Sequence, residues 1–276
     1  ERQSELFAAG DSPGIGLHAG NPPAAHSGIY QTILTETELH AWLARLEAAP
    51  LVSIDCETTS LNPMQAKLVG MSFCIDSPHA VYLPLAHQYA GAPQQLPMEM
   101  VLSSLKPWLE NAAKPKVGQN LKYDKHVLAN HGLELKGIAH DTLLQSYVLE
   151  SHRPHNMDNL ALRHLDIKTI SYDEVTGKGA SRIGFDQVAI DTATEYAAED
   201  ADITLRLHQT LYLSIQQEER LNYIYQEIEI PILDVLYEIE RNGVLLDAQL
   251  LQRQSHELGK RLWDLEQQAH LIAEQP

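Results

Sequence analysis

The stretch LVSIDCETTSL, residues 51–61, joins a β-branched apolar run to two carboxylates. Asp55 and Glu57 are two residues apart, so on a strand their side chains point to the same face. Alone, such a pair is more often structural than metal-binding. Its place at the carboxyl end of an apolar strand, before Thr-Thr-Ser, is typical of functional sites in α/β sheets. The pair therefore predicts an α/β domain with a site at this strand end.

Two further segments place a polar side chain one helical turn from a carboxylate. Asn120 precedes Asp124 by four residues in VGQNLKYD, and Tyr196 precedes Asp200 by four in EYAAEDAD. Each pair is expected on one side of a helix. Alone, Asp124 reads as a solvated helix residue and Tyr196 as a core aromatic. Gathered with the two strand carboxylates, they form an all-oxygen site suited to a pair of Mg²⁺ or Mn²⁺ ions, which cleaves phosphodiesters.

The charge balance limits the kind of nucleic-acid partner. The formal net charge of −17 argues against a long footprint on a duplex, which needs many Lys and Arg contacts to phosphate. A short grip on a strand end remains open, because two divalent ions would bring four positive charges to the acidic cluster. Local basic positions are Lys116, Lys122, Lys125 and Arg153.

Hydropathy and cysteine use indicate the compartment. No apolar run approaches the ~18 residues of a membrane span, and the polar start ERQSELFAAGDSPG lacks the pattern of a signal peptide. Cys56 and Cys74 lie in expected strands without metal-ligand spacing, so reduced core thiols are expected. The sequence thus predicts a cytoplasmic protein without a membrane partner.

The order of expected elements follows from hydrophobic period and capping signals. Residues 1–27 are rich in Gly, Pro, Ala and Ser and are expected to form a linker or a disordered terminus. Strands are expected at residues 30–34, 51–55, 68–75, 80–85 and 116–119, with 51–85 as an antiparallel unit. Helices are expected near residues 35–46, 99–109, 122–130, 142–149, 157–165, 192–217, 221–240 and 247–273.

Three signals define the helices at the carboxyl-terminal side. A Thr192/Glu195 capping box predicts the start of the long helix that carries Tyr196 and Asp200. Pro231 is expected to kink or split the next helix, which Asn242-Gly243 ends. A domain boundary is placed near residue 217.

Three segments together resemble a known family. IDCETTSLNPMQAKLVGMSF, KVGQNLKYDKHVLANHGLELKGIAHDTLLQSYVLES and EYAAEDADITLRLH look like the three exonuclease motifs of the proofreading domain in the bacterial DNA polymerase I family, the family A polymerases. The resemblance covers residues 28–217. It implies a ribonuclease H-like 3′-5′ exonuclease fold, a mixed sheet flanked by helices. IEIPILDVLYEIERNGVLLD resembles the start of the polymerase domain, so residues 218–276 are expected to form a helical appendage without polymerase activity of its own.

The resemblance also implies roles for single residues. Asp55, Glu57 and Asp200 match the ligands of a first metal, with Asp55 bridging to a second that Asp124 holds through water, and Tyr196 with Glu57 orients the attacking water. The residues that match contacts to the terminal nucleotides are Leu61, Gln119, Asn120 and Phe185, with Arg153 at phosphate.

The function implied is removal of 5′-mononucleotides from a single-stranded DNA 3′ end or a frayed primer terminus. Such an enzyme would use two divalent ions and serve DNA replication and repair as the proofreading part of a longer polymerase chain. Two alternatives remain. One is an RNA-trimming exonuclease of the same fold, and the other is a non-catalytic DNA-binding or scaffold module.

Overall fold

A six-stranded mixed sheet forms the centre of the computed structural model, which describes residues 24–25 and 28–274. The strand order is β2-β5-β4-β3-β6-β7, and β4 alone runs opposite to the others. The strands are β2 (Ile29–Thr32), β3 (Val52–Thr58), β4 (Leu68–Asp76), β5 (His79–Pro84), β6 (Lys116–Gly118) and β7 (Ile138–Asp141). The antiparallel unit expected at residues 51–85 is confirmed as β3, β4 and β5.

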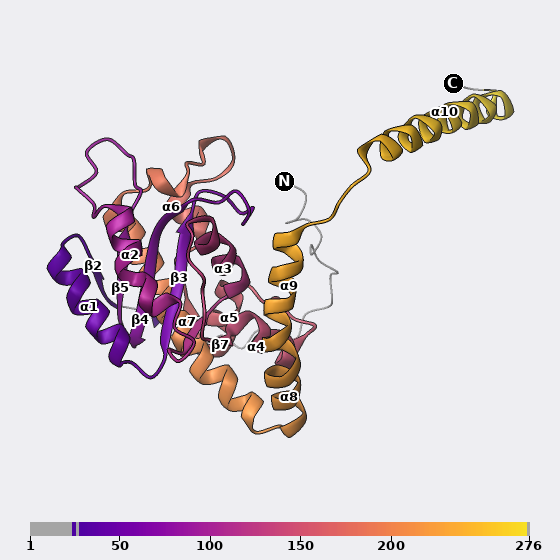
Figure 1. Ribbon diagram of the computed structural model, residues 1–276. Helices are drawn as coiled ribbons and strands as arrows, with labels where there is room; N and C mark the ends of the chain where they lie inside the picture. The colour runs from indigo at the N-terminus through magenta and orange to yellow at the C-terminus, as the bar shows by residue number, and fades with distance from the viewer. Residues whose placement is uncertain (1–23, 26–27, 275–276) are drawn as a thin grey trace. The chain divides into compact units, whose positions relative to one another are not determined.

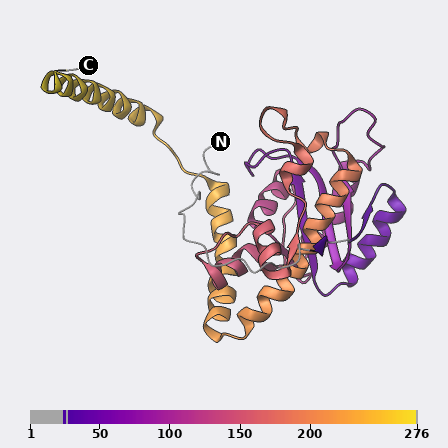
Figure 2. The same ribbon diagram turned by 180° about the vertical axis from the view of Figure 1, so that it is seen from behind.

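Helices cover both faces of this sheet (Figures 1 and 2). The helices of the described residues are α1 (Glu36–Ala48), α2 (Met98–Leu109), α3 (Leu121–Asn130), α4 (Thr142–Glu150), α5 (Met157–Leu165), α6 (Tyr172–Thr176), α7 (Ile190–Gln216), α8 (Glu219–Tyr223), α9 (Ile230–Asn242) and α10 (Ala248–Ala273). On one face, α1, α2 and α3 pack their buried Leu, Val and Trp side chains against Ile54 and Phe73. On the other face, α7 packs against Val69, Cys74 and Ala80. The sheet is therefore the middle layer of three.

Capping boxes in the sequence predict the start of α1 correctly but not the start of α7. The expected Thr35/Glu38 box caps α1, since the Thr35 Oγ1 accepts from the Glu38 N–H at 3.3 Å. The Thr192/Glu195 box was wrong as the start of α7, which begins two residues earlier at Ile190 with no side-chain cap. The Ile190 N–H donates instead to the Tyr89 hydroxyl at 3.1 Å. This tertiary partner satisfies a donor that a local cap would otherwise have served.

The chain after α7 departs from regular helix geometry. A π-helical segment, Ile224–Glu229, separates α8 from α9, just before Pro231. Because proline has no N–H, the α-helical bond at this point has no donor, which accounts for the expected disturbance. The helix α9 ends at Asn242, before Gly243 at φ 68°, as predicted.

Two compact units divide after Tyr237. The first holds the sheet and the helices up to that residue, and the second holds the end of α9 and α10. α10 is capped by Asp247, whose Oδ1 accepts from the Leu250 N–H at 2.9 Å. The boundary expected near residue 217 stays a prediction.

Most of the linker expected at residues 1–27 lies outside the described residues, except that Ala24–Ala25 (β1) pairs with Ile167–Lys168 (β8). Both cysteines are free and buried, as predicted. Among the described residues, no helix is long and apolar enough to cross a membrane.

Candidate active site

The strand β3 places two carboxylates on the face that meets α7. Ile54 and Cys56 join the apolar core on the side of α1–α3, so the alternation of the strand turns Asp55 and Glu57 the other way. Asp55 is half-buried and Glu57 is buried. The predicted common face of the two side chains is therefore confirmed.

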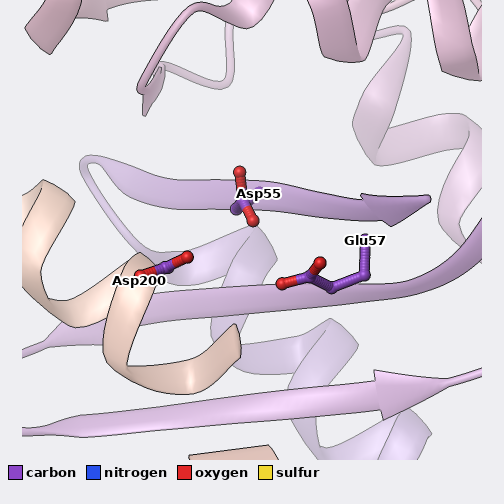
Figure 3. A group of neighbouring side chains, drawn as sticks. All are labelled: Asp55, Glu57 and Asp200. Carbon is purple, nitrogen blue, oxygen red and sulfur yellow. The ribbon is translucent and has the colours of Figure 1, made fainter. Parts of the chain in front are cut away.

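The helix α7 brings the third carboxylate to the same place. Its contact with the sheet is made by small buried residues, Ala193, Ala197, Ala198 and Ala201. Because alanine side chains are short, the helix backbone can approach the strands closely. Asp200 lies among these alanines and points to β3 (Figure 3).

The three acids form one compact group. Asp55, Glu57 and Asp200 each offer an oxygen, and these oxygens all lie within 4.8 Å of one another (Figure 3). Burial raises the pKa of Asp55 to about 6. Burial, followed by the charge of Asp55, raises the pKa of Glu57 and of Asp200 well above the usual range. Three carboxylates this close repel one another unless protons or a cation neutralise them.

The donor set fits a divalent metal ion. All the donor atoms are carboxylate oxygens, which hard cations such as Mg²⁺ and Mn²⁺ prefer. The Glu57 Oε1 is buried and has no hydrogen-bond partner in the described part of the chain. A buried carboxylate oxygen without a partner is costly, so a bound cation would satisfy it.

Asp124 lies apart from this group. It is only 2% exposed on α3 and is not among the oxygens gathered within 4.8 Å. Burial, then the charge of Asp55, raises the pKa of Asp124. Its Oδ1 has no hydrogen-bond partner among the described residues. Asp124 is therefore a fourth buried acid, close enough to Asp55 for the two charges to interact.

Tyr196 sits one helical turn before Asp200 on α7. Its ring centroid lies 5.8 Å from that of Phe185 and 6.2 Å from that of Tyr172, which fixes its orientation. Burial, then the charge of Asp200, raises the pKa of the Tyr196 hydroxyl. The hydroxyl therefore stays protonated and can donate a hydrogen bond next to the three acids.

The residues expected to contact a nucleotide take different positions. Leu61 is 92% exposed just after β3, as a surface contact requires. Gln119 donates from Nε2 to the His155 carbonyl at 2.9 Å. The expectation that Asn120 shares a helix face with Asp124 was wrong, because Asn120 precedes α3 in a left-handed conformation at φ 65°. Its side chain is exposed at the junction of β6 and α3.

A further correction concerns the aromatic residues. Phe185 is fully buried, so its side chain cannot meet a nucleotide in this conformation, and it instead supports Tyr196. Tyr172 was missed. It is 39% exposed beside Tyr196, and its ring stacks on Phe185 at 6.2 Å. The only sequence signal was its place after the Ser171 capping box, which starts α6 near the site.

The local basic side chains differ in whether they are accessible to a phosphate group. Lys116 is fully buried, and its Nζ donates to the Lys114 carbonyl at 2.9 Å. Lys125 is buried against Asp234, with Nζ and Oδ1 2.5 Å apart. Neither lysine is therefore free to bind phosphate, whereas Arg153 is exposed between α4 and α5.

Asp141 is a second residue that sequence reasoning missed. It is 1% exposed, and its carboxylate accepts from the N–H groups of Asn120 at 3.1 Å and Leu121 at 2.7 Å. It also accepts from the N–H groups of Leu143 and Leu144, at the start of α4. One carboxylate thus caps two helices. The available signal was an Asp directly before a predicted helix.

Comparison with known proteins agrees with this geometry. A family model described as a 3′-5′ exonuclease matches residues 30–216. DNA polymerase I of Pseudomonas aeruginosa is 49% identical over 249 residues, which make up 89% of this chain and 27% of that protein. The chain thus spans about a quarter of the length of this relative.

Solved structures share the fold at low sequence identity. The POL domain of Pol1 from M. smegmatis, in complex with a DNA primer-template and dNTP, matches with a TM-score of 0.71 at 19% identity, covering 88% of this chain and 38% of that one. Brucella melitensis NrnC with bound Mg²⁺ matches with a TM-score of 0.52 at 17% identity, covering 79% and 95%. The fold is the expected ribonuclease H-like exonuclease fold. Because the family model covers most of the sheet and its helices, this chain belongs to the 3′-5′ exonuclease family found in DNA polymerase I.

Proposed function

We propose that this chain removes 5′-mononucleotides one at a time from the 3′ end of single-stranded DNA, with two Mg²⁺ or Mn²⁺ ions. The observation that carries the proposal is the meeting of Asp55, Glu57 and Asp200 within 4.8 Å, at a site where burial raises the pKa of all three. An arrangement of this kind needs cations to be fully ionised.

The acids would divide the metal binding between them. Asp55, Glu57 and Asp200 would hold the first ion, and Asp124, which lies farther away, would hold the second through water, with Asp55 shared. Ions bound there would supply Lewis acidity to the attacking water and to the departing 3′ oxygen. The water oxygen would bond to the last phosphorus while the P–O3′ bond breaks, and a proton from the water would end on the departing 3′ oxygen. The products are a 5′-mononucleotide and a strand with a new 3′ hydroxyl.

Protein side chains would orient the reactants. The Tyr196 hydroxyl, kept protonated by burial, would donate a hydrogen bond that holds the water in line, together with Glu57. Leu61, Gln119 and Asn120 would contact the terminal nucleotides from the ends of β3 and β6. Tyr172 replaces Phe185 in this set, because its ring is exposed. Arg153 would contact phosphate.

Selection of a frayed end follows from the cost of unpairing. The site takes a single strand, and unpairing is cheapest at a mismatched primer terminus. Within a longer DNA polymerase I chain, this preference would correct replication errors. We propose this proofreading role for the chain, and a cytoplasmic location.

The test follows the length of a 5′-labelled DNA strand. With Mg²⁺ or Mn²⁺ the label should remain on a ladder of shortening strands, and EDTA should stop the reaction. Asp55→Asn is the inactive control, because it keeps the side-chain shape but removes the charge. A ladder with RNA but not with DNA would favour the RNA-trimming alternative. Binding of the strand without cleavage would favour a non-catalytic module.

A further inference from the structure

A tyrosine beyond the matched exonuclease segment is fully buried. Tyr225 belongs to the π-helical segment Ile224–Glu229, whereas the family model ends at residue 216. Its hydroxyl lies 3.0 Å from the Asp141 N and 3.0 Å from the Gln145 Nε2. The residue is therefore bound to the exonuclease core through polar atoms as well as through packing.

The hydrogen bonds around this hydroxyl form a complete set. The hydroxyl oxygen accepts from the Asp141 N–H and from Gln145, and its own hydrogen is left for the His140 Nδ1 at 3.3 Å. The second hydrogen of the Gln145 amide serves the His208 Nδ1 at 2.9 Å. A phenylalanine at position 225 would fill the same volume but leave two buried donors without an acceptor.

Asp141 connects this hydroxyl to the candidate active site. Its backbone N–H binds Tyr225, and its carboxylate holds the N–H groups of Asn120 and Leu121. These groups begin α3, which carries Asp124. The position of Tyr225 thus bears on the start of the helix that presents the fourth acid.

A second contact holds the same helix directly after Asp124. The Lys125 Nζ lies 2.5 Å from the Asp234 Oδ1 and 4.5 Å from the ring centroid of Tyr237, on α9. The His126 ring lies 4.6 Å from that of Tyr237. α3 is therefore fixed by the following helices both at its first residue and beside its carboxylate.

We propose that residues 219–237 are part of the exonuclease and that Tyr225 is a positioning residue, which sets Asp124 and Asn120 through Asp141. The proposal rests on the proposed function. It also implies that the functional unit extends about one helix beyond the segment that the family model matches.

The test compares Tyr225→Phe with Tyr223→Phe in the full chain. Tyr223 lies two residues away and is exposed, which makes it a matched control. Tyr225→Phe should lower kcat/KM on 5′-labelled single-stranded DNA by about 10–100-fold, the usual effect of removing a group that orients a ligand. It should also weaken the binding of the second of two Mn²⁺ ions, as measured by electron paramagnetic resonance in the absence of DNA. Tyr223→Phe should change neither quantity.

A third variant distinguishes the loss of a positioning contact from a general loss of stability. Leu46→Ala in α1 removes volume from the core between α1–α3 and the sheet, a cluster that does not include Tyr225, and its thermal unfolding is compared with that of Tyr225→Phe. If Leu46→Ala with an equal or larger drop in Tm lost as much activity and Mn²⁺, or if Tyr225→Phe matched the wild type, the positioning role would be wrong. If the wild type did not cut DNA, the proposed function would fail, and Mn²⁺ binding alone would still decide the role of Tyr225.

Discussion

Asp55 and Tyr196 approach the same centre, but their loss should have different consequences. Asp55→Asn or Asp200→Asn removes one of three clustered charges and should almost abolish cleavage. Tyr196→Phe keeps all the acids and loses one hydrogen bond, so its cost should be on the order of 10²-fold in kcat. Rates on single-stranded DNA, with Mn²⁺ binding measured beside them, give the ranking. Equal damage from Tyr196→Phe and Asp55→Asn would require another role for the tyrosine.

The clustered acids should make stability depend on pH and metal together. Their pKa values are raised in the folded chain, that of Asp55 to about 6, so the folded state holds protons that the unfolded state has released above about pH 4. Without metal, stability is therefore lost as the pH rises through about 6. Mg²⁺ binding restores it, so the difference in Tm between Mg²⁺ and EDTA should grow from pH 5 to pH 8.

Thermal unfolding at matched pH in both solutions measures this difference. Groups other than the clustered acids, such as His140 and His208, titrate alike in both solutions, so their contributions to the Tm difference cancel. An Asp55→Asn/Asp200→Asn double variant should show a much smaller difference. A Tm difference that is constant with pH in the wild type would mean that Mg²⁺ does not bind these carboxylates.

At the scale of elements, the aromatic residues of α6 and of the turn at Phe185–Gln187 should have different roles, substrate contact for Tyr172 and stability for Phe185. Phe185→Ala should lower the free energy of unfolding by about 3–5 kcal/mol, because it empties a fully buried site. Tyr172→Ala should cost less stability than Phe185→Ala, since the ring is partly exposed, and should raise KM for single-stranded DNA. Denaturant unfolding and steady-state kinetics on both variants test this division. An unchanged KM in Tyr172→Ala would remove that residue from the substrate site.

Elements with a strong local period could be predicted from the sequence, whereas tertiary junctions could not. The β-branched run at β3 and the alternation around Asp55 placed two acids on one face without further information. Asn120 was misplaced because its left-handed conformation is held by Asp141, 21 residues away. The roles of Phe185 and Tyr172 depend on their burial, which local sequence does not encode. Tyr225 required the same long-range information.

At the scale of the whole molecule, the two compact units differ in how they bury apolar side chains. In the first, Leu and Val side chains from both faces of the sheet are enclosed. In the second, α10 exposes most of its large apolar residues, including Leu258, Leu262 and Trp263. Exposed apolar stripes of this kind promote association.

The chain should therefore self-associate as its concentration rises. Light scattering after size exclusion should show a mass that increases with loading, and Leu258→Glu/Leu262→Glu should reduce this increase. Exonuclease activity should stay the same in that variant, because α10 belongs to the second unit. A monomeric wild type across the concentration range would contradict this expectation.

The two buried cysteines can report local opening of the structure through their reactivity. Cys56 lies between the two acids of β3, and Cys74 lies on the neighbouring strand β4, and the sequence has no others. A thiol reagent can react with either one only when the packing around β3 and β4 opens. The rate of thiol labelling then reports how often the sheet opens. Any ligand that ties β3 to α7 should slow that rate at Cys56, so its occupancy can be followed without a substrate or an engineered probe.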